Sequence, residues 1–166
     1  LGLPDFQADT DDNLLSALTH LLQLTQTDMT LFYRQLAKVD FSVEFGALDL
    51  SLLDEAYYTP TALGNEYKKA RTAWVEKYSN RLRHASISED ERVSRMNAVN
   101  PLYVPRNYLL QTAIDEANSG NFEEVHQLLE VFRSPYQENS RWVKYSQKRP
   151  AWANEKAGCS MLSCSS

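Results

Sequence analysis

The chain has 166 residues, and its apolar fraction of 43% and charged fraction of 23% are typical of a folded globular protein. The net charge of −5 argues against a general nucleic-acid binder. No apolar run approaches the roughly 18 residues of a membrane helix, and the five glycines are too scattered for a phosphate-binding loop. The chain begins with Leu1 instead of Met, and we expect it to be a piece of a longer protein.

Charge is distributed unevenly along the chain. Residues 1–65 contain ten acidic and two basic residues, whereas residues 66–83 contain six basic and two acidic ones. The segment 135–166 has five basic and two acidic residues. This pattern favours solvent-exposed helix faces, with electrostatic attraction between the acidic first segment and the basic later ones. A face that binds a partner is the alternative.

The first helix is expected to follow Thr10, which is a good capping residue, with Asp11 and Asp12 in the first turn. A second helix is expected to begin at Thr27-Asp28. Residues 39–46 alternate like a strand but have no evident partner, so we interpret them as a loop. The apolar stripes predicted for the two helices comprise Leu14, Leu15, Leu18, Leu21 and Leu22, then Leu31, Phe32 and Leu36.

A short helix is predicted over Leu48–Tyr57, and a long one is predicted to open with Pro60 in its first turn. We interpret the aromatic-rich stripe of the long helix as core. Ser88-x-x-Glu91 forms a capping box for the next helix, which we expect to end before Asn100-Pro101. The stripe of the long helix comprises Leu63, Tyr67, Ala70, Trp74, Tyr78 and Leu82.

Residues 105–134 predict a helical hairpin. Pro105 is expected to open its first helix, and Gly120 is able to take the positive φ that ends it. Asn121 is expected to cap the second helix. The predicted core positions are Leu109, Leu110, Ala113, Ile114 and Ala117, then Val125, Leu128, Leu129 and Phe132.

The segment from Pro135 onward loses helical periodicity. Its tryptophans, Trp142 and Trp152, and Tyr145 lie among basic residues, a pattern compatible with nucleic-acid stacking. We favour an extended segment whose aromatic rings dock on the acidic helical body. The fold class predicted is therefore all-α: an irregular multi-helix bundle over 1–134 that ends in a hairpin, followed by an extended tail over 135–166.

Few residues have the spacing of a catalytic or metal site. His20, His84 and His126 lie far apart, and the acidic run 89–91 is explained by a helix first turn. Cys159 and Cys164 are separated by four residues, which excludes a C-x-x-C motif. Both are expected in an exposed tail, where a thiol is either inert or open to oxidation, and a disulfide between them is sterically feasible.

Several motifs together resemble the selenoprotein O family, called YdiU in bacteria, over essentially the whole chain. The strongest is the stretch 95–115, RMNAVNPLYVPRNYLLQTAID, in which Pro105 replaces an expected aliphatic residue. The other motifs are TDMTLFYR at 27–34, GNFEE at 120–124, SPY at 134–136 and the terminal SCSS at 163–166.

The resemblance implies an atypical, pseudokinase-like fold that transfers AMP from ATP to protein hydroxyls with Mg²⁺ or Mn²⁺. The nucleotide-binding, metal-binding and catalytic residues of the family lie upstream, so no residue of this chain inherits a catalytic, cofactor or metal role. The chain corresponds to the last third of such a protein and is expected to pack on the kinase-like core. Cys164 matches the family's terminal cysteine, which implies a redox link to the activation segment.

The resemblance also implies protein substrates. From the net charge and the lack of a long apolar run, we expect neither nucleic acid nor membrane as a partner. Cysteine instead of selenocysteine favours a bacterial cytoplasmic protein. A self-standing helical interaction module without catalysis is the alternative, and the mass of the native polypeptide distinguishes the two.

Overall fold

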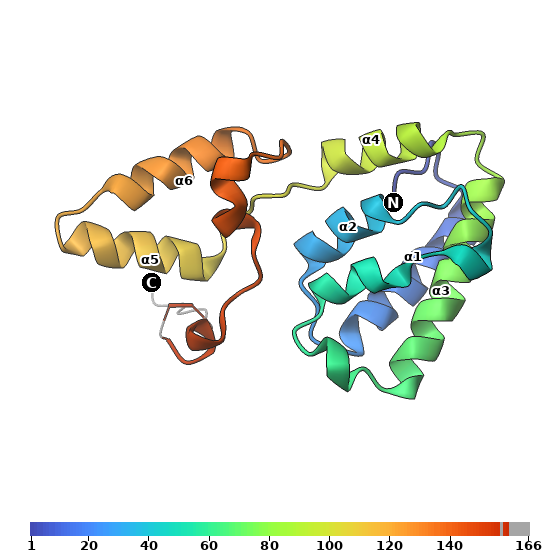
Figure 1. The fold of residues 1–166 in the computed structure, drawn as a ribbon. Helices are drawn as coiled ribbons and strands as arrows, with labels where there is room; N and C mark the ends of the chain where they lie inside the picture. The colour runs from blue at the N-terminus through green and yellow to red at the C-terminus, as the bar shows by residue number, and fades with distance from the viewer. Residues whose placement is uncertain (157, 160–166) are drawn as a thin grey trace. The chain divides into compact units, whose positions relative to one another are not determined.

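The computed structural model describes residues 1–156, 158 and 159, and it confirms the all-α fold class (Figure 1). The chain divides into two compact units, Leu1–Asn100 and Pro101–Ser166. This division differs from the one drawn from periodicity, because Trp142, Tyr145, Ala153 and Cys159 pack with the hairpin in the second unit. Within the described residues no strand forms, and Thr27 and Tyr57 make an isolated antiparallel bridge.

The first unit consists of four α-helices and three short 3-10 helices. The Asp28 side chain accepts a hydrogen bond from the Leu31 amide, and Ser88 accepts one from Glu91, so both predicted caps are confirmed. The elements are α1 (Ala8–Gln23), α2 (Met29–Lys38), η1 (Phe45–Ala47), η2 (Leu50–Ala56), η3 (Pro60–Ala62), α3 (Asn65–Arg83) and α4 (Glu89–Val99).

Two predicted helix starts in this unit are wrong. α1 begins at Ala8, and Asp11 rather than Thr10 stabilises its first turn by accepting a hydrogen bond from the Gln7 amide at 2.7 Å. Pro60 opens the separate 3-10 turn η3, and α3 begins only at Asn65. The short helix predicted over 48–57 is the 3-10 helix η2, which spans Leu50–Ala56.

The core of the first unit forms around the aromatic stripe of α3, as predicted. The Trp74 and Tyr78 rings stack with their centroids 5.3 Å apart, and Trp74 Nε1 donates a hydrogen bond to the Leu14 carbonyl at 3.1 Å. Phe32 and Leu36 of α2 are fully buried against this stripe. Leu15, predicted to be core, is 43% exposed, because α1 turns only the Leu14, Leu18 and Leu21 side toward α3.

A buried arginine joins α4 to the end of α2. Arg92 is 1% exposed, and its Nη2 donates to the carbonyls of Ala37 at 3.1 Å and Val39 at 2.8 Å. Its guanidinium lies 5.0 Å from the centroid of the Phe41 ring. These contacts satisfy carbonyls that the helix end leaves without partners, and they hold the chain that follows α2 in place.

The second unit is a helical hairpin with a covering segment. Gly120 has φ +86° and ends α5, as predicted, whereas α5 begins at Asn107 rather than Pro105. Asn121 accepts a hydrogen bond from the Glu123 amide at 3.1 Å at the start of α6. The elements are α5 (Asn107–Asn118), α6 (Glu123–Arg133), η4 (Ser140–Ser146) and η5 (Ala151–Asn154).

The tail docks by its aromatic residues, as predicted, but it is not extended. Tyr145 is fully buried, and the Trp142 ring meets Tyr103 edge-on at a centroid distance of 6.0 Å. Residues 140–146 and 151–154 form 3-10 helices, because the turns that bury Tyr145 and Ala153 require a more compact backbone than an extended chain.

Candidate functional site

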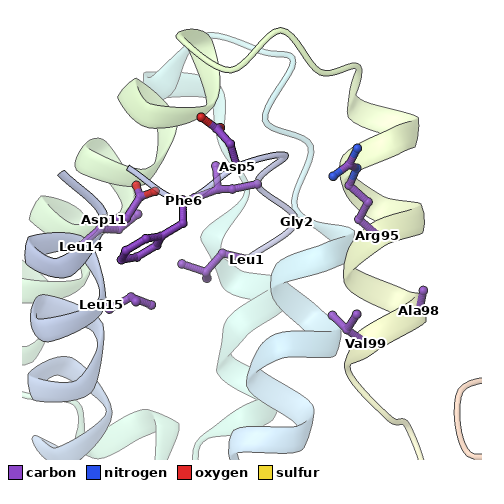
Figure 2. Close-up of a pocket in the computed structure, with 11 residues that line it drawn as sticks. Leu1, Gly2, Asp5, Phe6, Asp11, Leu14, Leu15, Arg95, Ala98 and Val99 are labelled. Carbon is purple, nitrogen blue, oxygen red and sulfur yellow. The ribbon is translucent and has the colours of Figure 1, made fainter. Parts of the chain in front are cut away.

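An apolar groove opens between α1, α4 and the first residues of the chain (Figure 2). It has a volume of about 480 Å³. Among its lining residues, Phe6 is 62% exposed, Val99 is 66% exposed and Leu14 is buried. The groove is lined by Leu1, Gly2, Leu3, Asp5, Phe6, Asp11, Leu14, Leu15, Arg95, Ala98 and Val99.

The charged residues of the groove already have partners. Arg81 Nε donates to Asp11 Oδ1 at 2.8 Å, and Arg81 Nη2 donates to Asp5 Oδ1 at 3.0 Å. Arg95 pairs with Glu91 on its own helix at 2.7 Å. With these charges neutralised, the groove is suited to an apolar side chain and not to an ionic ligand.

The Asp11–Arg81 pair is a buried electrostatic contact with a clear effect on titration. Burial opposes ionisation of Asp11, but the hydrogen bonds from Arg81 and the Gln7 amide outweigh it, so the pKa of Asp11 lies below its ordinary value of 3.8. The pair attaches the segment before α1 to α3. Sequence reasoning missed it, although Arg81 falls on the buried side of α3, three residues after Tyr78, which was a usable signal.

Arg81 also lines a second cavity of about 730 Å³ near the start of α1. Lys77 and Asp9 lie on its wall, together with Asn80 and His84. Since Arg81 is committed to Asp11 and Asp5, and Asp9 offsets Lys77, this cavity has no excess of one charge to attract an ion.

The three histidines are exposed and lie apart, and His84 Nδ1 contacts the Asn80 carbonyl at 2.7 Å. Across residues 1–156, 158 and 159, no three His, Cys, Asp or Glu side chains gather in a way that would hold a metal ion. The acidic run 89–91 has structural partners: Glu89 binds Arg92 at 2.5 Å, and Glu91 binds Arg95.

The structure describes Cys159 but not Cys164. Cys159 has a free thiol that is 3% exposed in the core of the second unit, so the expectation of an accessible thiol at this position is wrong. The Lys156–Asp115 ion pair and the turn at Gly158, with φ +83°, bring Cys159 back onto α5. Cys164 lies outside the described residues, as does its proposed disulfide.

No helix of the described residues is long and apolar enough to cross a membrane. The model of the family "Protein adenylyltransferase SelO" matches residues 1–133. The chain belongs to the SelO family. It is 49% identical over 156 residues to a "Protein nucleotidyltransferase YdiU" from Tolumonas auensis, covering 94% of this chain and 29% of that protein.

Another relative with the same printed name, from Rhodopirellula baltica, is 42% identical over 175 residues, covering 100% of this chain and 32% of that protein. The protein of this name from Azoarcus is 44% identical over 164 residues, covering 96% and 30%. The family resemblance stated from the motifs is therefore confirmed. The chain spans about a third of the length of the curated relatives that it matches.

Proposed function

We propose that this chain is the helical carboxyl-terminal part of a cytoplasmic protein adenylyltransferase, which transfers AMP from ATP to Ser, Thr or Tyr hydroxyls of proteins. The observation that carries this proposal is the family match over residues 1–133. The relatives named protein nucleotidyltransferase support the reaction class. Within the full protein, the chain packs on a kinase-like core that supplies the chemistry.

ATP and its Mg²⁺ or Mn²⁺ belong to that core in this proposal. Phosphoryl-group chemistry needs a phosphate cradle and positioned metal ligands. The described part of this chain does not fit such a group, because its acidic residues are scattered or paired with arginines and no metal cluster is found among them. We therefore assign no catalytic step to these residues.

Labelled ATP tests the proposal directly. The full-length protein is expected to transfer labelled AMP to an acceptor protein, whereas the 166-residue chain alone is expected to transfer none and to bind no ATP–Mg²⁺ tightly. Transfer by the isolated chain would contradict the division of roles, and no transfer by the full-length protein would contradict the activity.

Cys164 is proposed to be a redox latch in the full protein. Its thiol and a thiol of the activation segment would lose two protons and two electrons to a small-molecule disulfide, which is reduced to two thiols as the protein disulfide forms. The closed latch would restrict the cleft, so the reduced enzyme would be more active. Non-reducing peptide mapping tests this: Cys164 linked only to Cys159, or free under inhibiting oxidation, would exclude the latch.

A self-standing helical interaction module is the second candidate, and the uneven charge distribution is the observation that favours it. The mass of the native polypeptide in its source cell separates the two. A native mass near 19 kDa would favour the module. A mass about three times larger would agree with the length of the relatives, of which this chain covers 29–32%.

A further inference from the structure

One side of the α5–α6 hairpin carries exposed apolar side chains. Ile114 is 51% exposed, Phe122 and Leu129 are each 55% exposed, and Leu110 is 38% exposed. Sequence periodicity predicted three of these, Leu110, Ile114 and Leu129, to be core, and the structure contradicts that prediction. We call this surface the hairpin apolar face and define it by Leu110, Ile114, Phe122 and Leu129.

The opposite side of the hairpin is covered by residues 140–156, 158 and 159. Tyr145 donates from its hydroxyl to the Gln127 side chain of α6 at 2.7 Å. The Trp152 ring meets the Tyr108 ring of α5 edge-on at a centroid distance of 6.2 Å. The covering segment therefore occupies the side of the hairpin on which Tyr108 and Gln127 lie.

Helix geometry places the apolar face on the other side. Successive residues of an α-helix are about 100° apart, so Leu110 lies about 200° from Tyr108, and Leu129 lies about 200° from Gln127. The helices are antiparallel, with Ala113 and Leu128 buried in the hairpin's core. The two exposed stripes consequently emerge on the same side, as one surface.

The chemistry of this surface is that of a permanent interface. Its four members carry no charge, and the neighbouring Glu130 and Arg133 pair with each other at 2.6 Å. Scattered single apolar residues are normal on a protein surface, but a contiguous patch of large ones marks a contact site. Permanent interfaces are apolar and poor in unpaired charges, whereas a transient charged partner would require complementary charges.

We propose that the hairpin apolar face packs against the part of the full-length protein that lies outside this chain. This inference rests on the proposed function, which gives that part as the kinase-like core. Two observations support this occupant: the matched relatives have about two-thirds of their length outside this chain, and the family match includes both helices that carry the face.

Thiol labelling in two contexts tests the inference. Leu129→Cys introduces a thiol on the face, and Val143→Cys is the matched control, because Val143 is also apolar and is 54% exposed in η4 on the covered side. Ile114→Cys repeats the test on α5. Each variant is labelled with a maleimide, both in the 166-residue chain and in the full-length protein, and peptide mass spectrometry reads the rate at each site.

The expected result is that Leu129→Cys and Ile114→Cys react at least about tenfold more slowly in the full-length protein than in the isolated chain, with Val143→Cys unchanged. Equal rates for the face positions in both contexts would overturn the inference, as would equal slowing of Val143→Cys. Slow labelling of the isolated chain together with a dimeric mass in light scattering would assign the face to a second copy instead. AMP transfer is measured separately: slowed labelling without transfer would contradict the proposed function and leave the interface standing.

Discussion

The two units complete their cores to different degrees. In the first unit, residues of α1, α2 and α4 pack with the stacked Trp74 and Tyr78 rings of α3, and the buried Arg92 donates to a carbonyl at the end of α2. In the second unit, two helices are covered on one side only. Of the twelve large apolar side chains exposed among the described residues, seven lie in this smaller unit. A helix pair covered by one segment buries only one of its two sides. We therefore expect the second unit to bury its other side against a surface outside the unit.

The strongest test of this difference is truncation inside the first core. Phe32 is fully buried beside Trp74, and Phe32→Ala is expected to lower the free energy of unfolding by about 3–5 kcal/mol. Phe6→Ala, at a position that is 62% exposed, is the control and is expected to change it by less than about 0.5 kcal/mol. Urea denaturation followed by circular dichroism measures both. Similar costs at the two positions would contradict the core assignment.

The hairpin offers a test with two adjacent leucines. Leu128 is 4% exposed and Leu129 is 55% exposed. Leu128→Ala is expected to destabilise the isolated chain by about 2–4 kcal/mol, whereas Leu129→Ala should cost less than about 0.5 kcal/mol, as should Glu130→Ala. Urea melts of the three variants provide the measurement, and equal effects of Leu128→Ala and Leu129→Ala would show that the face assignment is wrong.

The buried ion pair predicts a dependence on pH. Because the pKa of Asp11 is lowered in the folded state, its stabilising contribution is present above 3.8, its ordinary value, and is lost as the pH falls through the folded pKa. At neutral pH, Asp11→Asn is expected to cost about 1.5–3 kcal/mol, because it removes a charged partner of Arg81.

The difference between Asp11→Asn and the parent chain should therefore shrink as the pH is lowered below 3.8. Thermal melts between neutral and acidic pH measure this difference. A constant difference across that range would mean that ionisation of Asp11 contributes nothing to folding.

The smallest expected effects concern the cysteines. Cys159→Ser places a hydroxyl in the apolar cluster of the second unit and should cost about 1 kcal/mol. Cys164→Ser is expected to leave the melting temperature unchanged, since the role proposed for this thiol is a link to a segment outside this chain. Thermal melts under reducing conditions compare the two variants, and a larger loss from Cys164→Ser would reverse the assigned roles.

Sequence periodicity predicted the aromatic stripe of α3, the caps at Asp28 and Ser88 and the turn at Gly120, because each depends on residues close together in the chain. It did not predict the burial of Arg92 and Arg81, whose partners include Val39, 53 residues from Arg92, and Asp11, 70 residues from Arg81. Periodicity also predicted that Leu129 is buried, because the sequence does not show how much of an apolar helix stripe is covered by its neighbours.

The predictions about the candidate site likewise succeeded for local sequence features and failed for contacts between distant segments. Family motifs identified the protein family, whereas the groove beside α1 and α4 and the exposure of the hairpin face are properties of packing between distant segments. Cys159 was placed in an exposed tail because the composition around it is that of a chain end. The Lys156–Asp115 contact that returns it to α5 joins residues 41 positions apart.

The positions of the three tryptophans make the chain suitable for fluorescence measurements. Trp74 is 1% exposed in the first unit, whereas Trp142 and Trp152 belong to the second, where Trp152 is 49% exposed. The tryptophan emission of a Trp74→Phe variant would therefore come only from the second unit, at longer wavelengths and with greater sensitivity to acrylamide quenching. Its emission would report separately how the second unit responds to denaturant and to added protein.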